Sequence, residues 1–404
     1  MTVPKVEIGF SGPSLRTAFQ LDDPTYGRLD SGVLGVGVTL VDVTDRLVSL
    51  NIRRGRNEKT EPTQAGQATI TLRNRDGLLD PLNTASSLYP GVEPRRPVNV
   101  YADGVQVYAG WVDDLDLDYS PGGDAEVTVS ASDGLARLAL AEFPVGGTAF
   151  SQADSGQRVT DVLNSVPTAW TAGSAIDTGD STLAAGTASG NVLQYLQTVE
   201  RSEGGYLFVN REGDLTFRNR NNPAQNPGGL IVSDAGGTAC TPFVEISRQA
   251  GIEDVYNRVS AIHTGSTVIA SDTDSITDYG LRELELGELL LTSESDTQQR
   301  VEYEVVRRAD ALTSVKSVTV DQAATGGGCS LTLQHDLGDS VKVIFTPPGV
   351  TQQTQTSVLL GVDHRWQVSG TWRTTFRVGP VDEGAFLILD DVDYGQLDVG
   401  ALAF

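Results

Sequence analysis

Alternating apolar and polar residues fill the stretch from Leu47 to Leu140, in short runs that turn sequences separate. A period of two places successive side chains on opposite faces of a β-strand, so each such run has one buried and one solvated face. Asp103-Gly104 lies between two valine-rich runs and predicts a hairpin, because Asp-Gly adopts the positive φ angles of a type I′ turn. Several strands and turns at this spacing predict a small β-barrel or sandwich.

A different pattern begins near Glu142 and predicts a module that contains helices. Apolar residues at helical spacing predict one helix that starts after Ser155 and a second from Asn191 to Glu203. Gly204 follows directly, at the position where a left-handed C-cap ends a helix. Two short apolar runs within residues 206–218 then predict a hairpin.

The region from Phe243 to Pro380 again reads mainly as strands, with one helix predicted from Gln298 to Arg308. The sequence therefore predicts a mainly β chain with a small α+β module, in which two antiparallel β-barrel domains flank a helix-containing module. The predicted parts are an N-terminal arm and first strand (1–46), a β-barrel domain (47–141), the α+β module (142–242), a second β-barrel domain (243–380) and a C-terminal tail or docking segment (381–404).

The charge of the chain restricts its partners. The sequence has 29 Lys and Arg against 53 Asp and Glu, a formal net charge of −24. Nucleic-acid binding needs clustered basic residues, and so does docking on an anionic membrane surface, so both are disfavoured. The two cysteines and the lack of a secretory or membrane-spanning apolar segment indicate synthesis in a reducing cytoplasm.

The acidic run after Trp111 has the D-x-D-x-D spacing with which a calcium loop begins. An EF-hand loop also needs Gly at its sixth position and Glu at its twelfth, where this chain has Tyr119 and Ala125. The alternation with leucines instead predicts a strand with an acidic outer face made of Asp113, Asp114, Asp116 and Asp118. A second oxygen-rich run, Ser271 to Ser275, is interpreted as a solvated loop.

No motif in the sequence predicts catalysis. The three histidines, His263, His335 and His364, do not form a zinc-hydrolase motif and are expected to be structural. No GxSxG nucleophile elbow is present. We therefore predict no catalytic, cofactor-binding or metal-binding residue, no cofactor and no enzymatic activity.

The basic clusters and one tryptophan are the remaining candidate functional residues. In an acidic chain they fit pairing with acidic groups, within the fold or between subunits, better than nucleic-acid contact. The candidates for inter-subunit or structural pairing are Arg53, Arg54, Arg56, Arg95, Arg96 and Trp111.

Particular short segments, in this order, carry a resemblance to a known family. They are Arg53–Arg56, Gln64–Gly66, Thr69–Gly77, Leu79–Asn83, Tyr89–Pro90, Pro94–Pro97, Tyr108–Trp111, Asn191–Leu193, Ser202–Gly205, Leu207–Val209, Gly213–Phe217, Leu337–Asp339, Gly361–His364, Gly370–Phe376 and Phe386–Phe404. The chain resembles the minor tail proteins of long-tailed actinobacterial phages, specifically the tail hub at the distal end of the tail tube. The resemblance covers most of the chain from about residue 47 and brings no catalytic signature with it.

The resemblance implies a virion protein of the tail tip, assembled in the host cytoplasm. It implies a homotrimer in which two β-barrel domains per chain form a pseudo-sixfold ring that matches the hexameric tail tube. The implied partners are the tail tube or distal tail protein, the tape measure protein and other minor tail proteins, which provide contact with the host surface. DNA would pass through the ring without sequence-specific binding, and the acidic surplus would repel its phosphates. Two alternatives stay open: a receptor- or carbohydrate-binding tail-tip protein and a tail-associated peptidoglycan hydrolase.

Overall fold

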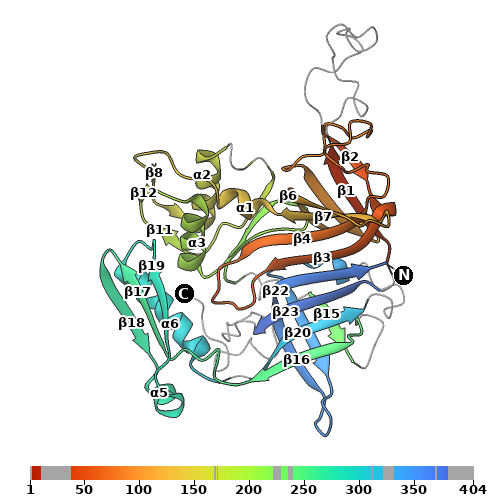
Figure 1. Cartoon of the computed structure of the whole chain (residues 1–404). Coiled ribbons are helices and arrows are strands. Elements are labelled where there is room, and N and C mark those ends of the chain that lie inside the picture. Colours follow the sequence, from red (N-terminus) through yellow and green to blue (C-terminus); the bar gives the residue numbers. More distant parts are fainter. Residues whose placement is uncertain are drawn as a thin grey trace.

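The protein is described here from a computed structural model (Figure 1). It describes residues 2–10, 38–167, 170, 172–221, 229–234, 240–311, 313–321, 332–368 and 371–380. Strands dominate these residues, and a smaller helical part lies to one side of the main sheet (Figure 1). The predicted fold class, a mainly β chain with a small α+β module, is confirmed.

Within the described residues, thirteen strands form one large sheet. Seven strands, which we call the first β region, are β1 (Pro4–Phe10), β2 (Thr39–Asp42), β3 (Leu47–Gly55), β4 (Gln64–Arg73), β5 (Pro97–Ala102), β6 (Val105–Tyr119) and β7 (Ala125–Ser132). Six, which we call the second β region, are β15 (Leu230–Ser233), β16 (Glu245–Ala250), β20 (Thr313–Asp321), β21 (Ser340–Phe345), β22 (Gln353–Gln367) and β23 (Arg373–Pro380). The first region thus includes two strands of the predicted N-terminal arm, and the second includes one strand of the predicted α+β module. The strand order is β16-β20-β23-β22-β3-β4-β7-β6-β5-β1-β2, with β21 also beside β22 and β15 beside β21.

Strand β22 joins the two β regions. Its first half pairs with β21, its second half pairs with β3, and β23 accompanies it along the other side. The two regions, which the sequence suggested as separate barrels, therefore share one continuous hydrogen-bonded sheet. Gly55 lies at this junction with φ of +88°, and a Cβ there would be 2.2 Å from the carbonyl oxygen of Leu360. Glycine is needed at this position because any side chain would collide with backbone.

The apolar residues of the predicted alternation form the core of the first β region. Leu50, Ile52, Ile70 and Leu72 are buried, and each such side chain contributes roughly 1.5–3 kcal/mol on leaving water. The pattern shifts at the start of β3, where a bulge buries Leu47 rather than the next residue. The predicted Asp-Gly hairpin turn forms between β5 and β6, with both φ angles positive.

The helical part forms a separate layer beside the sheet (Figure 1). Its helices are α1 (Gly134–Leu138), α2 (Ser155–Ser165) and α3 (Val192–Glu203), of which α2 and α3 agree with the two predicted helices. The Asn191 side chain caps the start of α3, and Gly204 ends it with φ of 76°. Short strands accompany these helices: β8 (Thr148–Phe150), β9 (Ala153–Asp154), β10 (Ser174–Ile176), β11 (Thr182–Leu183), β12 (Gly186–Ala188), β13 (Tyr206–Val209) and β14 (Leu215–Arg218).

The segment from Arg258 to Arg308 packs with the helical part rather than with the second β region. It contains β17 (Arg258–His263), β18 (Ser266–Ser271), α5 (Thr273–Tyr279), β19 (Glu283–Glu288) and α6 (Glu294–Arg308). Val259 and Val301 belong to the same hydrophobic cluster as Val159 and Leu196 of α2 and α3. The interpretation of Ser271–Ser275 as a solvated loop is wrong, because Asp272 caps α5 and the helix begins at the next residue. Among the described residues, no helix is long and apolar enough to span a membrane.

Candidate functional site

One row of cross-strand partners runs over six neighbouring strands of the large sheet. From β23 to β6, through β22, β3, β4 and β7, the partners in register are Arg373, Arg365, Asn51, Thr69, Ser130 and Asp114. Five of these side chains are exposed and Ser130 is half-buried, so the row lies on the solvent face of the sheet. The row has two arginines at one end and an aspartate at the other. The sheet therefore has a basic end and an acidic end on one face.

The basic end is a depression of about 560 Å³, which we call the arginine hollow. It is lined by Ser49, Leu50, Asn51, Thr69, Arg365, Trp366, Gln367, Thr371 and Arg373. Arg365 and Arg373 are directly opposite each other across the β22–β23 ladder, which is unfavourable for like charges. Arg373 Nε lies 3.5 Å from Asp321 Oδ2, whereas Arg365 forms no ion pair with a described residue. The hollow can therefore bind a further carboxylate or another anion.

The acidic end is the strand segment that carries Asp113, Asp114, Asp116 and Asp118, which we call the acid ribbon. All four side chains are exposed, and none forms an ion pair with a described residue. A bulge between Val112 and Asp114 exposes two consecutive aspartates. Pairing with β5 ends at Trp111, and Arg95 and Arg96 bond to the backbone of Val112, so beyond Val112 β6 has only β7 beside it among the described residues.

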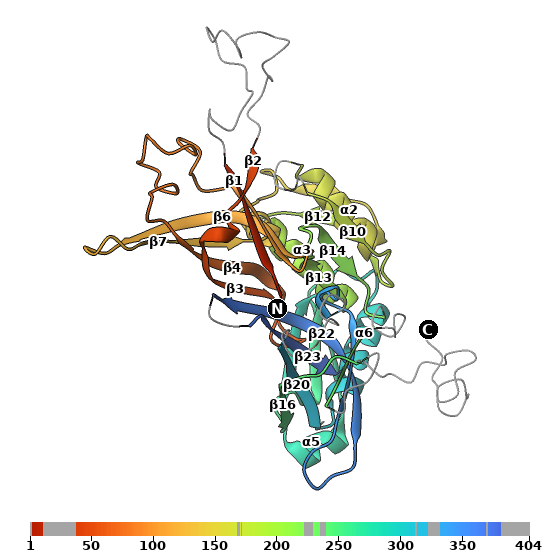
Figure 2. The ribbon, with the colours of Figure 1, turned by 90° about the vertical axis from the view of Figure 1, so that its right-hand side faces the viewer.

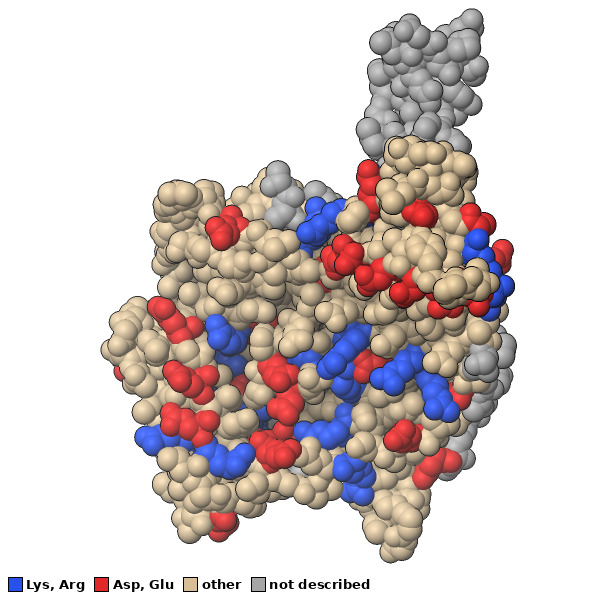
Figure 3. All heavy atoms as spheres, in the orientation of Figure 1, with Lys and Arg blue, Asp and Glu red and all other residues tan. Residues whose placement is uncertain are grey.

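The charges of the acid ribbon can serve the fold itself or an interaction with a partner. Charges on an open strand edge block uncontrolled pairing with other strands, which is a sufficient structural reason for them. Figure 2 shows the β6–β7 hairpin projecting from the body of the molecule. Figure 3 shows acidic side chains gathered along this hairpin, with basic side chains below them over β3, β22 and β23. The two charged ends are therefore accessible on one face.

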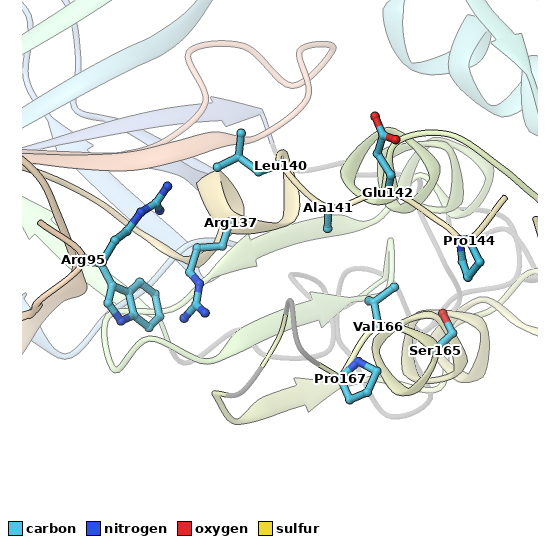
Figure 4. A pocket seen from close by; sticks show the side chains of 10 residues that line it. Arg95, Arg137, Leu140, Ala141, Glu142, Pro144, Ser165, Val166 and Pro167 are labelled. Carbon is cyan, nitrogen blue, oxygen red and sulfur yellow. The ribbon is translucent and has the colours of Figure 1, made fainter. Parts of the chain in front are cut away.

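A larger groove, of about 770 Å³, lies between the first β region and the helical part (Figure 4). Arg95 and Arg137 lie at one end, with Pro144 and Ser165 at the other (Figure 4). The Arg137 guanidinium stacks over the Trp111 ring, 4.7 Å from its centroid. The structure thus brings two of the candidate residues, Arg95 and Trp111, into one groove.

Backbone contacts hold the edge of this groove. Arg95 has φ of 64°, and its N–H donates to the carbonyl oxygen of Val112 at 2.6 Å. The N–H of Val112 donates in return to the Arg96 carbonyl oxygen at 2.8 Å, and the Arg96 side chain pairs with Glu93 at 2.5 Å. Arg96 therefore fixes the loop, whereas the side chain of Arg95 is exposed.

The arginines of the first cluster separate. Arg53 is exposed and donates to Asn57, but Arg54 and Arg56 are buried. Arg54 pairs with Asp336 at 2.8 Å, and Arg56 pairs with Glu200 of α3 at 3.2 Å. These two arginines therefore connect parts of one chain. The alternation of β3 contained the signal, because Arg54 falls on the same strand face as Leu50 and Ile52.

A buried carboxyl that the sequence interpretation missed caps α1. Asp133 accepts hydrogen bonds from the N–H groups of Gly66 and Leu135, at 2.7 and 2.9 Å. Burial raises its pKa to about 7, and these two hydrogen bonds and Arg54 oppose the rise. The sequence signal is the position of Asp133 directly before the first residue of α1, because aspartate is a preferred N-cap residue.

His364 shows the structural role expected of the histidines. Burial lowers its pKa to about 3, and Nδ1 lies 3.0 Å from Thr374 Oγ1. Trp372 Nε1 donates to the same hydroxyl at 3.2 Å. Within the described ranges, no three His, Cys, Asp or Glu side chains form a group that could hold a metal ion.

Comparison with known proteins gives a likeness at the level of fold. No protein-family model matches the sequence, and no curated protein matches it. The structure is similar to the tail protein from Neisseria meningitidis MC58, with a TM-score of 0.59 and 12% identity over 94% of this chain and 96% of that one. This chain has the fold of that tail protein.

A second solved structure agrees. The 43 kDa tail protein of prophage MuSo2 from Shewanella oneidensis has a TM-score of 0.59 and 13% identity, covering 85% of this chain and 94% of that one. Both likenesses extend over most of each chain.

Proposed function

We propose that this chain is a structural protein of a phage tail, a trimeric hub at the distal end of the tail tube. One observation supports this above the others: the chain shares its fold, over 94% and 85% of its length, with a tail protein from Neisseria meningitidis and a prophage tail protein from Shewanella oneidensis. In the proposed ring, each of three chains contributes two β regions, and six such units surround a central axis. Because β22 joins these regions within each chain, their relative position would be set before assembly.

The proposed hub joins the tail tube to the tip proteins and forms a conduit for DNA during ejection. Its partners would be the tail tube or distal tail protein, the tape measure protein and other minor tail proteins. The net charge of −24 supports passage without adhesion, because an acidic wall repels the phosphate backbone. A reconstruction of the assembled ring tests this part, since a neutral or basic bore would contradict it.

The cheapest test of the hub is the mass of the purified full chain, measured by light scattering. A stable species near three times the chain mass of 42.8 kDa is expected. A folded single chain at every concentration, especially one that binds a cell-surface carbohydrate, would instead support a receptor-binding tail protein. Binding to isolated cell walls, measured by co-sedimentation, separates these outcomes.

A further inference from the structure

We propose that the acid ribbon of one copy of this chain docks in the arginine hollow of the next copy. This inference rests on the proposed hub, because it assigns the contact that closes the ring. It names the partner surface on each side, Asp114, Asp116 and Asp118 on one copy and Arg365 and Arg373 on the other.

The two surfaces cannot meet within one molecule. Arg373 and Asp114 occupy the two ends of the same row, on the first and last of six adjacent strands. Adjacent strands lie about 4.8 Å apart, so five spacings put these positions roughly 24 Å apart along the sheet. Their side chains are far too short to span that distance. A second copy supplies the missing charge for each end.

The charges of the two surfaces match in arrangement. Alternate residues on a strand are about 6.8 Å apart, so Asp114, Asp116 and Asp118 present a line of carboxylates on one side of β6. The two opposed arginines lie side by side, and their guanidinium groups can bind carboxylates with paired hydrogen bonds. An incoming carboxylate would also relieve the repulsion between Arg365 and Arg373.

The rest of the hollow suits a polar strand. Asn51, Thr69 and Gln367 add amide and hydroxyl groups around the arginines, and half-buried Trp366 gives an apolar side. Beyond Val112 one edge of β6 faces no neighbouring strand among the described residues. The Leu115 N–H on β6 donates to Asp114 Oδ1, and the other backbone groups of this edge can bond to such groups. The hollow and the open edge thus complement each other in hydrogen bonding as well as charge.

The two surfaces differ, so the contact is head-to-tail rather than between identical patches. Such a contact generates a closed ring when its rotation closes and a filament when it does not. Each copy offers one acid ribbon and one arginine hollow, so a closed ring of three leaves neither surface unpartnered. This agrees with the trimer of the proposed function.

Charge reversal in the full chain tests the contact, with mass by light scattering and fold by circular dichroism as readouts. The ribbon variant is Asp114→Lys, Asp116→Lys and Asp118→Lys together; the hollow variant is Arg365→Glu with Arg373→Glu. We expect each variant to raise the concentration at which the trimer dissociates by at least about 100-fold, because close charge pairs across interfaces are strongly coupled. A chain with both sets of changes should recover the trimer.

The matched control reverses three exposed acids elsewhere, Asp274→Lys, Asp278→Lys and Glu302→Lys, and should leave the trimer unchanged. If the ribbon variant forms trimers at the same concentration as this control, the docking is overturned while the hub proposal stands. Wild-type chains that are single and folded at every concentration overturn the hub itself. The docking would also be overturned if the hollow variant stays trimeric but loses the binding of a soluble cell-wall glycan that the wild-type chain binds.

Discussion

Arg377 on β23 and Asp363 on β22 form an ion pair, with Nη1 2.7 Å from Oδ1, beside the point where the two β regions meet. The same guanidinium donates from Nη2 to the carbonyl oxygen of Arg54 at 2.7 Å and from Nε to that of Arg56 at 3.2 Å. One side chain thus links three consecutive strands. Gly361 leaves the space that it occupies, because a Cβ there would lie 2.2 Å from Nη2.

Replacing Arg377 should therefore loosen the junction. Arg377→Met is expected to lower the free energy of unfolding by about 2–4 kcal/mol, because it leaves a mostly buried carboxylate and two carbonyl oxygens without their donor. Urea unfolding followed by circular dichroism measures this. The control is Arg75→Met, which removes an exposed pair with Asp124 and should change stability by less than about 1 kcal/mol.

The close approach of β3 and β22 predicts an intolerance of side chains at Gly55. Gly55→Ala should destabilise the fold by more than about 2 kcal/mol, since it adds a backbone collision to an unfavourable φ. Gly104→Ala is the matched control, because Gly104 also has positive φ (+79°) but nothing within 4 Å of the added Cβ. Equal melting temperatures for the two variants would contradict the importance of the junction.

Arg53 and Arg56 should differ strongly in how much their replacement lowers the free energy of unfolding. Arg56→Met is expected to cost about 3–5 kcal/mol, because it leaves the buried Glu200 carboxylate without its partner. Arg53→Met, three positions earlier and exposed, should change stability by less than about 0.5 kcal/mol. Denaturant titration of both variants decides the point, and comparable losses would show that Arg56 acts only through general charge.

Asp133 predicts a pH dependence of stability. Its pKa is raised from 3.8 to about 7 in the folded protein, so between these values the folded state holds a proton that the unfolded state has lost. Stability from this group is therefore full at low pH and is lost as the pH rises towards 7, by up to about 4 kcal/mol. Asp133→Asn should flatten the wild-type decrease between pH 4 and 8. An unchanged slope in chemical unfolding would assign the pH dependence to other groups.

Local sequence patterns predicted the elements of this fold well. The alternation around Leu50 and Ile70 identifies strands, and Asn191 with Gly204 marks both ends of α3, because capping and side-chain periodicity are local properties. Long-range pairing was not predictable in this way. The β3–β22 ladder joins positions 55 and 361, and nothing within either segment specifies the other strand as its neighbour.

The candidate site also combines locally predictable features with pairings that the sequence does not reveal. The sequence places Asp113 to Asp118 on one strand and predicts their acidic outer face, but it cannot show that the β23 end of the same row carries Arg365 and Arg373. That relationship depends on the register of five strand pairs. The packing of residues 258–309 against α2 and α3 was likewise hidden, because apolar periodicity shows which face is buried but not what covers it.

The sharing of β22 has a consequence for heating. If either β region unfolded, β22 would lose its hydrogen-bonded partners on one side, and the other region pairs with the same strand. Neither region can therefore unfold alone without breaking hydrogen bonds of the other. Calorimetry should consequently record one endotherm for both, and limited digestion should yield no surviving half.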